Sequence, residues 1–231
     1  MGNQILIIAH RGASAYEPEN TLPSINKALE LGAKWIEIDV HKCENNVIVI
    51  HDHFLFRKTN GRGFVSGKSL EYIRSLDAGN GAVIPLLTEV IDLTAGKSGL
   101  NIELKGKETA EPVAQILLKY IKDGICKYED FILSSFNYNE LRKIKSLDRK
   151  FNTALLTRNS GAKALNLSTE LGAKTVHVYY RFIKKKFVEK AHGLGIKVYT
   201  YTVNDPKICI KLNSIGVDGV FSDYPDLLHR Q

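Results

Sequence analysis

The sequence has few cysteines and no long apolar run. Its three cysteines, Cys43, Cys126 and Cys209, are an odd number and show no CxxC spacing, so we expect neither a disulfide scaffold nor a zinc site. No segment approaches the roughly 20 consecutive apolar residues of a membrane-spanning helix. The apolar run near the N-terminus is too short for a signal peptide and follows no basic residue. These absences predict a cytoplasmic protein without a stable membrane anchor.

Concentrated positive charge is also absent, although basic residues are in excess. The formal net charge is +7, yet only Lys184-Lys185-Lys186 forms a basic run, and no aromatic residues are interleaved with it. This pattern favours a solvated helix face over a nucleic-acid-binding surface. A positive surface can still attract an anionic substrate to its site.

Apolar strand-like runs alternate with amphipathic helical segments along most of the 231 residues. Residues 53–85 interrupt the alternation with loop-type sequence and one short helix, and we expect an insertion there that is too small to fold alone. A tight turn at Asn45-Asn46 would join the second strand to a hairpin extension. The expected strands are 5–9, 34–40, 99–104, 130–134, 152–156, 175–178, 197–202 and 219–221, and a helical turn is expected at 225–230.

Eight such units predict a single-domain (β/α)8 TIM barrel over residues 1–231, with the insertion after the second strand. A doubly wound open sheet is the alternative. It would normally carry a glycine-rich phosphate loop after its first strand, and His10-Arg11-Gly12-Ala13 is not such a loop.

Charged and titratable residues gather where the apolar runs end. In a TIM barrel the C-terminal strand ends converge on one face, and that face holds the active site. The residues at those positions are His10, Arg11, Glu37, Asp39, His51, Asp52, Glu103, Lys105 and Asn204. Such a set predicts metal-assisted acid–base chemistry on an anionic substrate.

Glu37 and Asp39 are two positions apart, so on a strand their side chains point to the same side. Two carboxylates in one space repel unless a cation separates them, and Glu103 would add a third. Oxygen ligands suit Ca²⁺ or Mg²⁺. The alternative is that Glu37 or Asp39 pairs with a basic residue on an outer face.

His10 and His51 are candidates for an acid–base pair because histidine titrates near neutral pH. Arg11 would hold a phosphate oxygen, and Lys105 would add a second positive charge. His53 has no assigned role. His177 and His192 fit structural positions, the first in a strand and the second at a helix end.

Several motifs occur together in one order along the chain. They are His10-Arg11-Gly12, Pro18-Glu19-Asn20-Thr21, Glu37-x-Asp39, His51-Asp52, Asn101-Ile102-Glu103-Leu104-Lys105, Tyr201-Thr202-Val203-Asn204 and Gly216-Val217-Asp218-Gly219. With insertion motifs such as Thr59-Asn60-Gly61 and Leu76-Asp77-Ala78-Gly79, this ordered set resembles the glycerophosphodiester phosphodiesterase family from residue 5 to about residue 225.

The resemblance implies hydrolysis of a glycerophosphodiester to glycerol phosphate and an alcohol. It implies one divalent ion, Ca²⁺ or Mg²⁺, at Glu37, Asp39 and Glu103, with His10 and His51 as the acid–base pair. Arg11 and Lys105 would lie near the phosphate. Glu19 and Asn20 would border the site, although capping of the first helix is an alternative for both.

The chain departs from the family pattern at two positions. Tyr201 stands where tryptophan is common, so the wall that contacts substrate is smaller and carries a hydroxyl. Phe56 stands where an acidic residue is common. The segment Phe54-Leu55-Phe56 is either packing of the insertion or an apolar lip.

Two other functions remain as alternatives. A lysophospholipase D-type hydrolase would use the same chemistry and would need a groove for an acyl chain. A non-catalytic phosphate-binding barrel would be expected to have lost part of the acid–base or metal set, and the sequence retains all of it.

Overall fold

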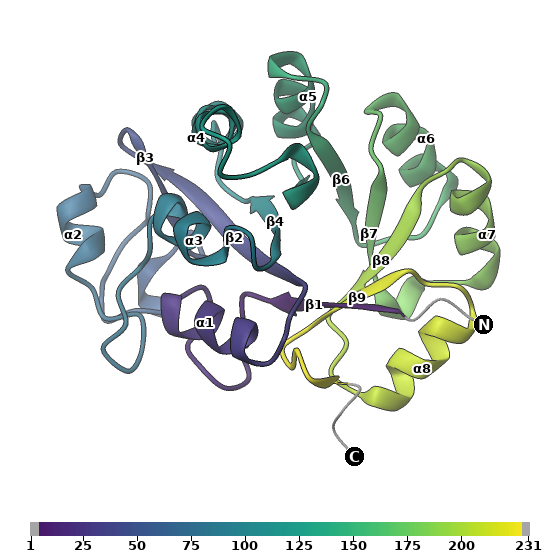
Figure 1. Cartoon of the computed structure of the whole chain (residues 1–231), viewed down its shortest axis with the longest axis horizontal. Helices are drawn as coiled ribbons and strands as arrows, with labels where there is room; N and C mark the ends of the chain where they lie inside the picture. Colours follow the sequence, from purple (N-terminus) through teal and green to yellow (C-terminus); the bar gives the residue numbers. More distant parts are fainter. Residues whose placement is uncertain (1–4, 228–231) are drawn as a thin grey trace.

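The computed structural model describes residues 5–227 and contains a closed barrel of eight parallel strands (Figure 1). The strand β1 pairs with both β2 and β9, which closes the sheet on itself. The barrel strands are β1 (Leu6–His10), β2 (Trp35–Cys43), β4 (Gly99–Leu104), β5 (Phe131–Ser135), β6 (Asn152–Thr157), β7 (Thr175–Tyr179), β8 (Lys197–Tyr201) and β9 (Gly219–Ser222). The predicted TIM barrel is confirmed, and the open-sheet alternative is wrong.

Helices surround the barrel and cover its outer face (Figure 1). They are α1 (Leu22–Glu30), α3 (Leu87–Thr94), α4 (Ala110–Lys122), α5 (Tyr138–Leu147), α6 (Ala162–Glu170), α7 (Lys185–Gly193) and α8 (Pro206–Ser214). Three-residue 3-10 turns occur at η1 (Leu55–Arg57), η2 (Tyr128–Asp130) and η3 (Tyr180–Phe182). Of the helical turn expected at 225–230, residues 228–230 lie outside the described part of the chain.

The interior of the barrel changes from apolar to polar along the strands. Ile8, Ile132 and Tyr199 belong to one buried apolar cluster inside it. Side chains two positions further along a strand point to the same side, so Ile8 is followed by His10 and Ile132 by Ser134. The C-terminal strand ends therefore bring polar groups into the barrel mouth.

An antiparallel hairpin carries the insertion. β3 (Asn46–Val49) pairs with the outer half of β2, and Cys43 faces Asn46. The turn is therefore Glu44-Asn45, and the prediction of Asn45-Asn46 is wrong by one residue. The buried side chains of the two strands fix this register, because a shift of one residue would turn them to the other face. Because this register places Glu44 in the turn, its backbone has a φ of +52°, in the left-handed region.

The insertion packs on the hairpin through a small apolar cluster. Leu55, Val65 and Ile73 are buried there against Ile48 and Ile50 of the hairpin. It contains the short helix α2 (Leu70–Arg74), which lies on the opposite side of the barrel from α7 (Figure 1). The division of the chain into one catalytic domain with this insertion stays a prediction.

Candidate active site

Three buried carboxyl groups meet at the mouth of the barrel. Glu37 and Asp39 lie on β2 and Glu103 lies on β4, where Asp39 is its register partner. One oxygen from each lies within 4.8 Å of the others. The side chains face the mouth and not an outer face of the barrel, so the outer-face alternative for Glu37 and Asp39 is wrong.

Two cations accompany this carboxylate cluster. Arg11 Nε lies 3.2 Å from Asp39 Oδ2, and Lys105 Nζ lies 2.9 Å from Glu103 Oε1 and 3.7 Å from Asp39 Oδ1. Glu37 accepts a hydrogen bond of 2.9 Å from the Arg11 backbone N–H. Three carboxyl groups thus face two cationic side chains, so one further positive charge would balance the cluster if all three were ionised.

The pKa shifts follow from burial and mutual repulsion. Burial, followed by repulsion from Asp39, raises the pKa of Glu103 to about 7. Burial and the charges of Asp39 and Glu103 raise the pKa of Glu37 well above its ordinary value. Burial alone would raise the pKa of Asp39 too, but Arg11 and Lys105 lower it below its ordinary value. The cluster consequently tends to retain a proton when no further cation is present.

His10 ends β1 and is oriented by a carboxylate from the far end of the chain. Its Nδ1 lies 2.6 Å from Asp223 Oδ1, so Nε2 is left for other contacts. Asp223 also accepts hydrogen bonds from Ser14 Oγ and Asn204 Nδ2. Burial opposes its ionisation, but these bonds and His10 lower the pKa of Asp223 to about 2.

The turn after His10 requires unusual backbone conformations. Arg11 and Gly12 have φ values of +57° and +83°. A Cβ on Gly12 would lie 2.4 Å from Ser24 Oγ, while Ser24 Oγ donates a hydrogen bond to the Arg11 carbonyl. The glycine therefore lets α1 approach the turn that positions His10 and Arg11.

His51 follows the hairpin and repeats the arrangement found at His10. Its Nδ1 lies 3.0 Å from Asp52 Oδ1, and Asp52 forms an ion pair with Arg57. Burial, with Arg11 and Lys105 nearby, lowers the pKa of His51. His51 is therefore mainly neutral at pH 7.

Glu19 and Asn20 contact the site and do not cap α1. Asn20 donates a hydrogen bond of 2.9 Å to Asp39 Oδ2 and accepts one from the Asp39 backbone N–H. Glu19 accepts a hydrogen bond from Arg11 and forms an ion pair with Lys58. The helix is capped by the Thr21 side chain, so the capping alternative for Glu19 and Asn20 is wrong.

These groups line one cavity of about 220 Å³. Its lining includes the charged and titratable residues His10, Arg11, Glu37, His51, Glu103, Lys105 and Arg158, and the rings of Phe136, Tyr201 and Phe221. Tyr201 donates a hydrogen bond to the Thr157 carbonyl, and its ring lies edge-on to Phe136. The lining of the cavity thus combines charged groups with aromatic rings.

Sequence reasoning missed Asp223, Phe136 and Arg158. Asp223 directly follows β9, so the same strand-end rule that selected His10 would have found it. Phe136 and Arg158 lie just beyond β5 and β6, where no motif distinguishes them from ordinary loop residues.

His53, His177 and His192 lie outside the proposed pair of His10 and His51. Burial lowers the pKa of His177 to about 3; its ring stacks on Tyr199, and it lines the cavity. His192 forms an ion pair with Asp218. His53 is exposed and lies edge-on to His41.

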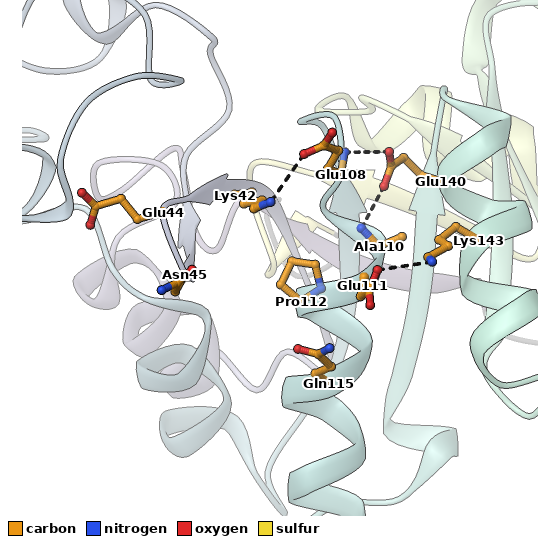
Figure 2. Close-up of a pocket in the computed structure, with 10 residues that line it drawn as sticks. All are labelled: Lys42, Glu44, Asn45, Glu108, Ala110, Glu111, Pro112, Gln115, Glu140 and Lys143. Atoms are coloured by element: carbon orange, nitrogen blue, oxygen red, sulfur yellow. Dashed lines mark hydrogen bonds and ion pairs between the residues drawn. The ribbon is translucent and has the colours of Figure 1, made fainter.

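A larger hollow of about 680 Å³ lies between the hairpin and α4 (Figure 2). Its two lysines are each paired with a glutamate, Lys42 with Glu108 and Lys143 with Glu111. Glu140 accepts hydrogen bonds from the backbone N–H groups of Glu108 and Ala110 at the start of α4. Figure 2 shows these interactions within the hollow. It lacks the convergent charge of the barrel mouth.

The chain matches the model of the glycerophosphoryl diester phosphodiesterase family over residues 10–227. The chain belongs to this family. A glycerophosphodiester phosphodiesterase of Caldanaerobacter subterraneus is 36% identical, with 96% of each chain covered. One of Bacillus subtilis is 30% identical, covering 99% of this chain and 86% of the relative.

A solved Oleispira antarctica phosphodiesterase, in complex with the product sn-glycerol-3-phosphate, has a similar structure. Its TM-score is 0.90 at 32% identity, and the match covers 97% of this chain and 95% of that one. The predicted resemblance is confirmed, and with it the enzyme class of a phosphoric diester hydrolase. Among the helices of residues 5–227, none has the length and apolar character needed to cross a membrane.

Proposed function

We propose that this member of the glycerophosphodiester phosphodiesterase family hydrolyses glycerophosphodiesters to glycerol phosphate and an alcohol, with a divalent ion and paired histidines. The observation that carries the proposal is the 220 Å³ cavity at the barrel mouth. It combines a carboxylate cluster, two cations and two imidazoles whose Nδ1 atoms each face a carboxylate.

The carboxylate cluster fits a hard divalent ion. Glu37, Asp39 and Glu103 supply only oxygen ligands, as Ca²⁺ and Mg²⁺ prefer. Asp39 Oδ1 is buried without a hydrogen-bond partner, and Lys105 Nζ lies 3.7 Å from it, so this oxygen could accept a closer contact from a bound ion. When bound, the ion would neutralise charge on the phosphoryl group. Ca²⁺ and Mg²⁺ are both compatible with this ligand set.

Arg11 and Lys105 are the proposed phosphate contacts. Both line the cavity, and their present partners are the carboxylates of the cluster. Their fixed charges would stabilise negative charge that develops on the phosphoryl oxygens. Glu19 and Asn20 would act as positioning residues, because they hold the Arg11 and Asp39 side chains.

The histidines would divide the proton transfers. His51, neutral at pH 7, would accept a proton from the nucleophile, which is either water or the neighbouring hydroxyl of the substrate. His10 would protonate the departing alkoxide, and Asp223 would stabilise the positive charge on His10 before that transfer. Attack by the substrate hydroxyl would give a cyclic phosphate that can be trapped and analysed.

The size of the cavity favours a small, deacylated substrate. Its 220 Å³ lies below the roughly 300–1,000 Å³ of typical sites for drug-sized ligands. Tyr201 and Phe136 would contact the leaving alcohol.

The cytoplasmic location expected from the cysteine content stays a prediction.

The test is release of glycerol phosphate from a panel of glycerophosphodiesters, with EDTA and with added Ca²⁺ or Mg²⁺. Activity should require the ion and fall by roughly 10²–10⁴ in both His10→Ala and His51→Ala. An ester with a nitrophenol leaving group should restore much of the lost rate in His10→Ala but not in His51→Ala, because nitrophenolate leaves without a proton. Equal restoration in both variants would contradict the assignment of roles. Full activity in EDTA would contradict the proposed requirement for a metal ion.

A further inference from the structure

Three phenylalanines form an exposed cluster on the insertion. The Phe54 ring lies 5.6 Å from the Phe56 ring and 4.4 Å from the Phe64 ring, measured between centroids. The three side chains are 39%, 63% and 54% exposed, respectively. Single exposed apolar residues are ordinary, but a contiguous exposed group of rings marks an interaction surface.

The segments that carry the three rings are held by buried neighbouring side chains and by backbone hydrogen bonds. Leu55 and Val65, next to them in sequence, are buried in the apolar cluster of the insertion. Leu55 N–H donates a hydrogen bond to the Gly63 carbonyl, and Val65 N–H donates one to the His53 carbonyl. Alternation along these segments therefore buries one set of side chains and turns the phenylalanines outward. Of the segment Phe54-Leu55-Phe56, only Leu55 packs within the insertion as expected, because both phenylalanines are exposed.

The same segment carries charge of one sign. Residues 54–68 include Arg57, Lys58, Arg62 and Lys68 and contain no aspartate or glutamate. Arg57, Lys58 and Arg62 are exposed. Arg57 and Lys58 are paired with Asp52 and Glu19, so the positive charge that complements a uniformly negative surface comes mainly from Arg62 and the half-buried Lys68. The rings suit the boundary between lipid headgroups and acyl chains. We define residues 54–68 as the aromatic–basic loop.

This loop is attached to the rim of the candidate active site. Arg57 forms an ion pair with Asp52, which contacts His51, and Lys58 forms one with Glu19, which contacts Arg11. A surface bound by the loop would therefore lie beside the mouth of the barrel.

We infer that the aromatic–basic loop docks the protein on the surface of an anionic lipid bilayer. The rings enter the headgroup region, and the basic side chains contact the anionic headgroups. The contact is peripheral and reversible, because it involves three rings and no membrane-spanning segment. It does not depend on the proposed hydrolysis, so the two can fail separately.

The experiment measures binding of the full chain to vesicles of phosphatidylcholine with and without 30% phosphatidylglycerol. We expect binding to the anionic vesicles, weakened by 0.5 M salt because salt screens the attraction. The double variant Phe56→Ser/Phe64→Ser should bind at least tenfold more weakly. Arg62→Gln/Lys68→Gln should also bind more weakly, since each basic residue near an anionic surface adds to the attraction.

The matched control is Ile210→Ser, which removes a side chain that is 62% exposed on α8 and should leave vesicle binding unchanged. Hydrolysis of a water-soluble glycerophosphodiester should be unchanged in both double variants. A second measurement follows the tryptophan fluorescence of Phe56→Trp. When anionic vesicles are added, its emission should shift to shorter wavelength relative to that of the natural protein, in which Trp35 is the only tryptophan.

Absence of binding to the anionic vesicles would overturn the inference. So would undiminished binding by Phe56→Ser/Phe64→Ser, because attraction would then come from the overall positive charge without the rings. An equal loss in Ile210→Ser would likewise overturn it.

Discussion

Stability of the metal-free protein should fall as the pH rises through neutrality, because of Glu103. The pKa of this group is raised from 4.5 to about 7 in the folded chain, so the folded state binds the proton more tightly than the unfolded state. Its stabilising contribution is complete below pH 4.5 and is lost as the pH passes 7. The shift corresponds to about 3 kcal/mol, or roughly 6–12 °C in Tm for a chain of this size.

The assay is thermal unfolding between pH 5 and pH 8 in EDTA, for the natural protein and for Glu103→Gln. The variant cannot ionise at this position, so its Tm should fall less over the same range. Added Ca²⁺ or Mg²⁺ should raise the Tm of the natural protein more at pH 8 than at pH 5, because the ligands are then ionised. Parallel pH profiles for the two proteins, or equal stabilisation by the ion at both pH values, would refute the reasoning.

Three further substitutions test other parts of the site. Asp223→Asn removes the carboxylate that contacts His10 Nδ1 and should lower kcat by roughly 10²-fold or more, with little change in KM. Steady-state kinetics against a circular dichroism control checks this, and unchanged kcat would contradict it. Gly12→Ala places a Cβ against Ser24 at a φ of +83° and should destabilise the fold by about 1–3 kcal/mol in denaturant unfolding. Arg158→Gln removes a positive charge from the lining of the cavity, so kcat/KM should rise for substrates with a cationic leaving alcohol relative to those with an anionic one. An unchanged ratio would exclude Arg158 from leaving-group selection.

The sequence predicted most of the fold because buried parallel strands leave a strong local signal. The run Leu6–Ala9 before His10, for example, is apolar and includes β-branched residues, and the segments between such runs have helical periodicity. Glu37 and Asp39 are two positions apart, and this spacing predicted that their side chains lie on the same side of the strand. Residues at the ends of such strands could therefore be grouped before their distances were known.

Contacts across the barrel closure could not be predicted in this way. Asp223 reaches His10 across 213 positions in the chain, and that pairing depends on β1 and β9 meeting side by side. The aromatic–basic loop shows a second limit. Its composition was visible, but which rings point outward depends on how Leu55 and Val65 pack.

Both ends of the insertion are held at the same short strand. His51 lies two residues after β3, and the chain returns at Pro85, whose carbonyl accepts a hydrogen bond from Val49 N–H. Because the two ends are fixed close together, doubling the intervening length would cost only about 0.6 kcal/mol of closure entropy. New surfaces beside the barrel mouth can therefore arise through insertions and deletions in this segment that leave His51 in register.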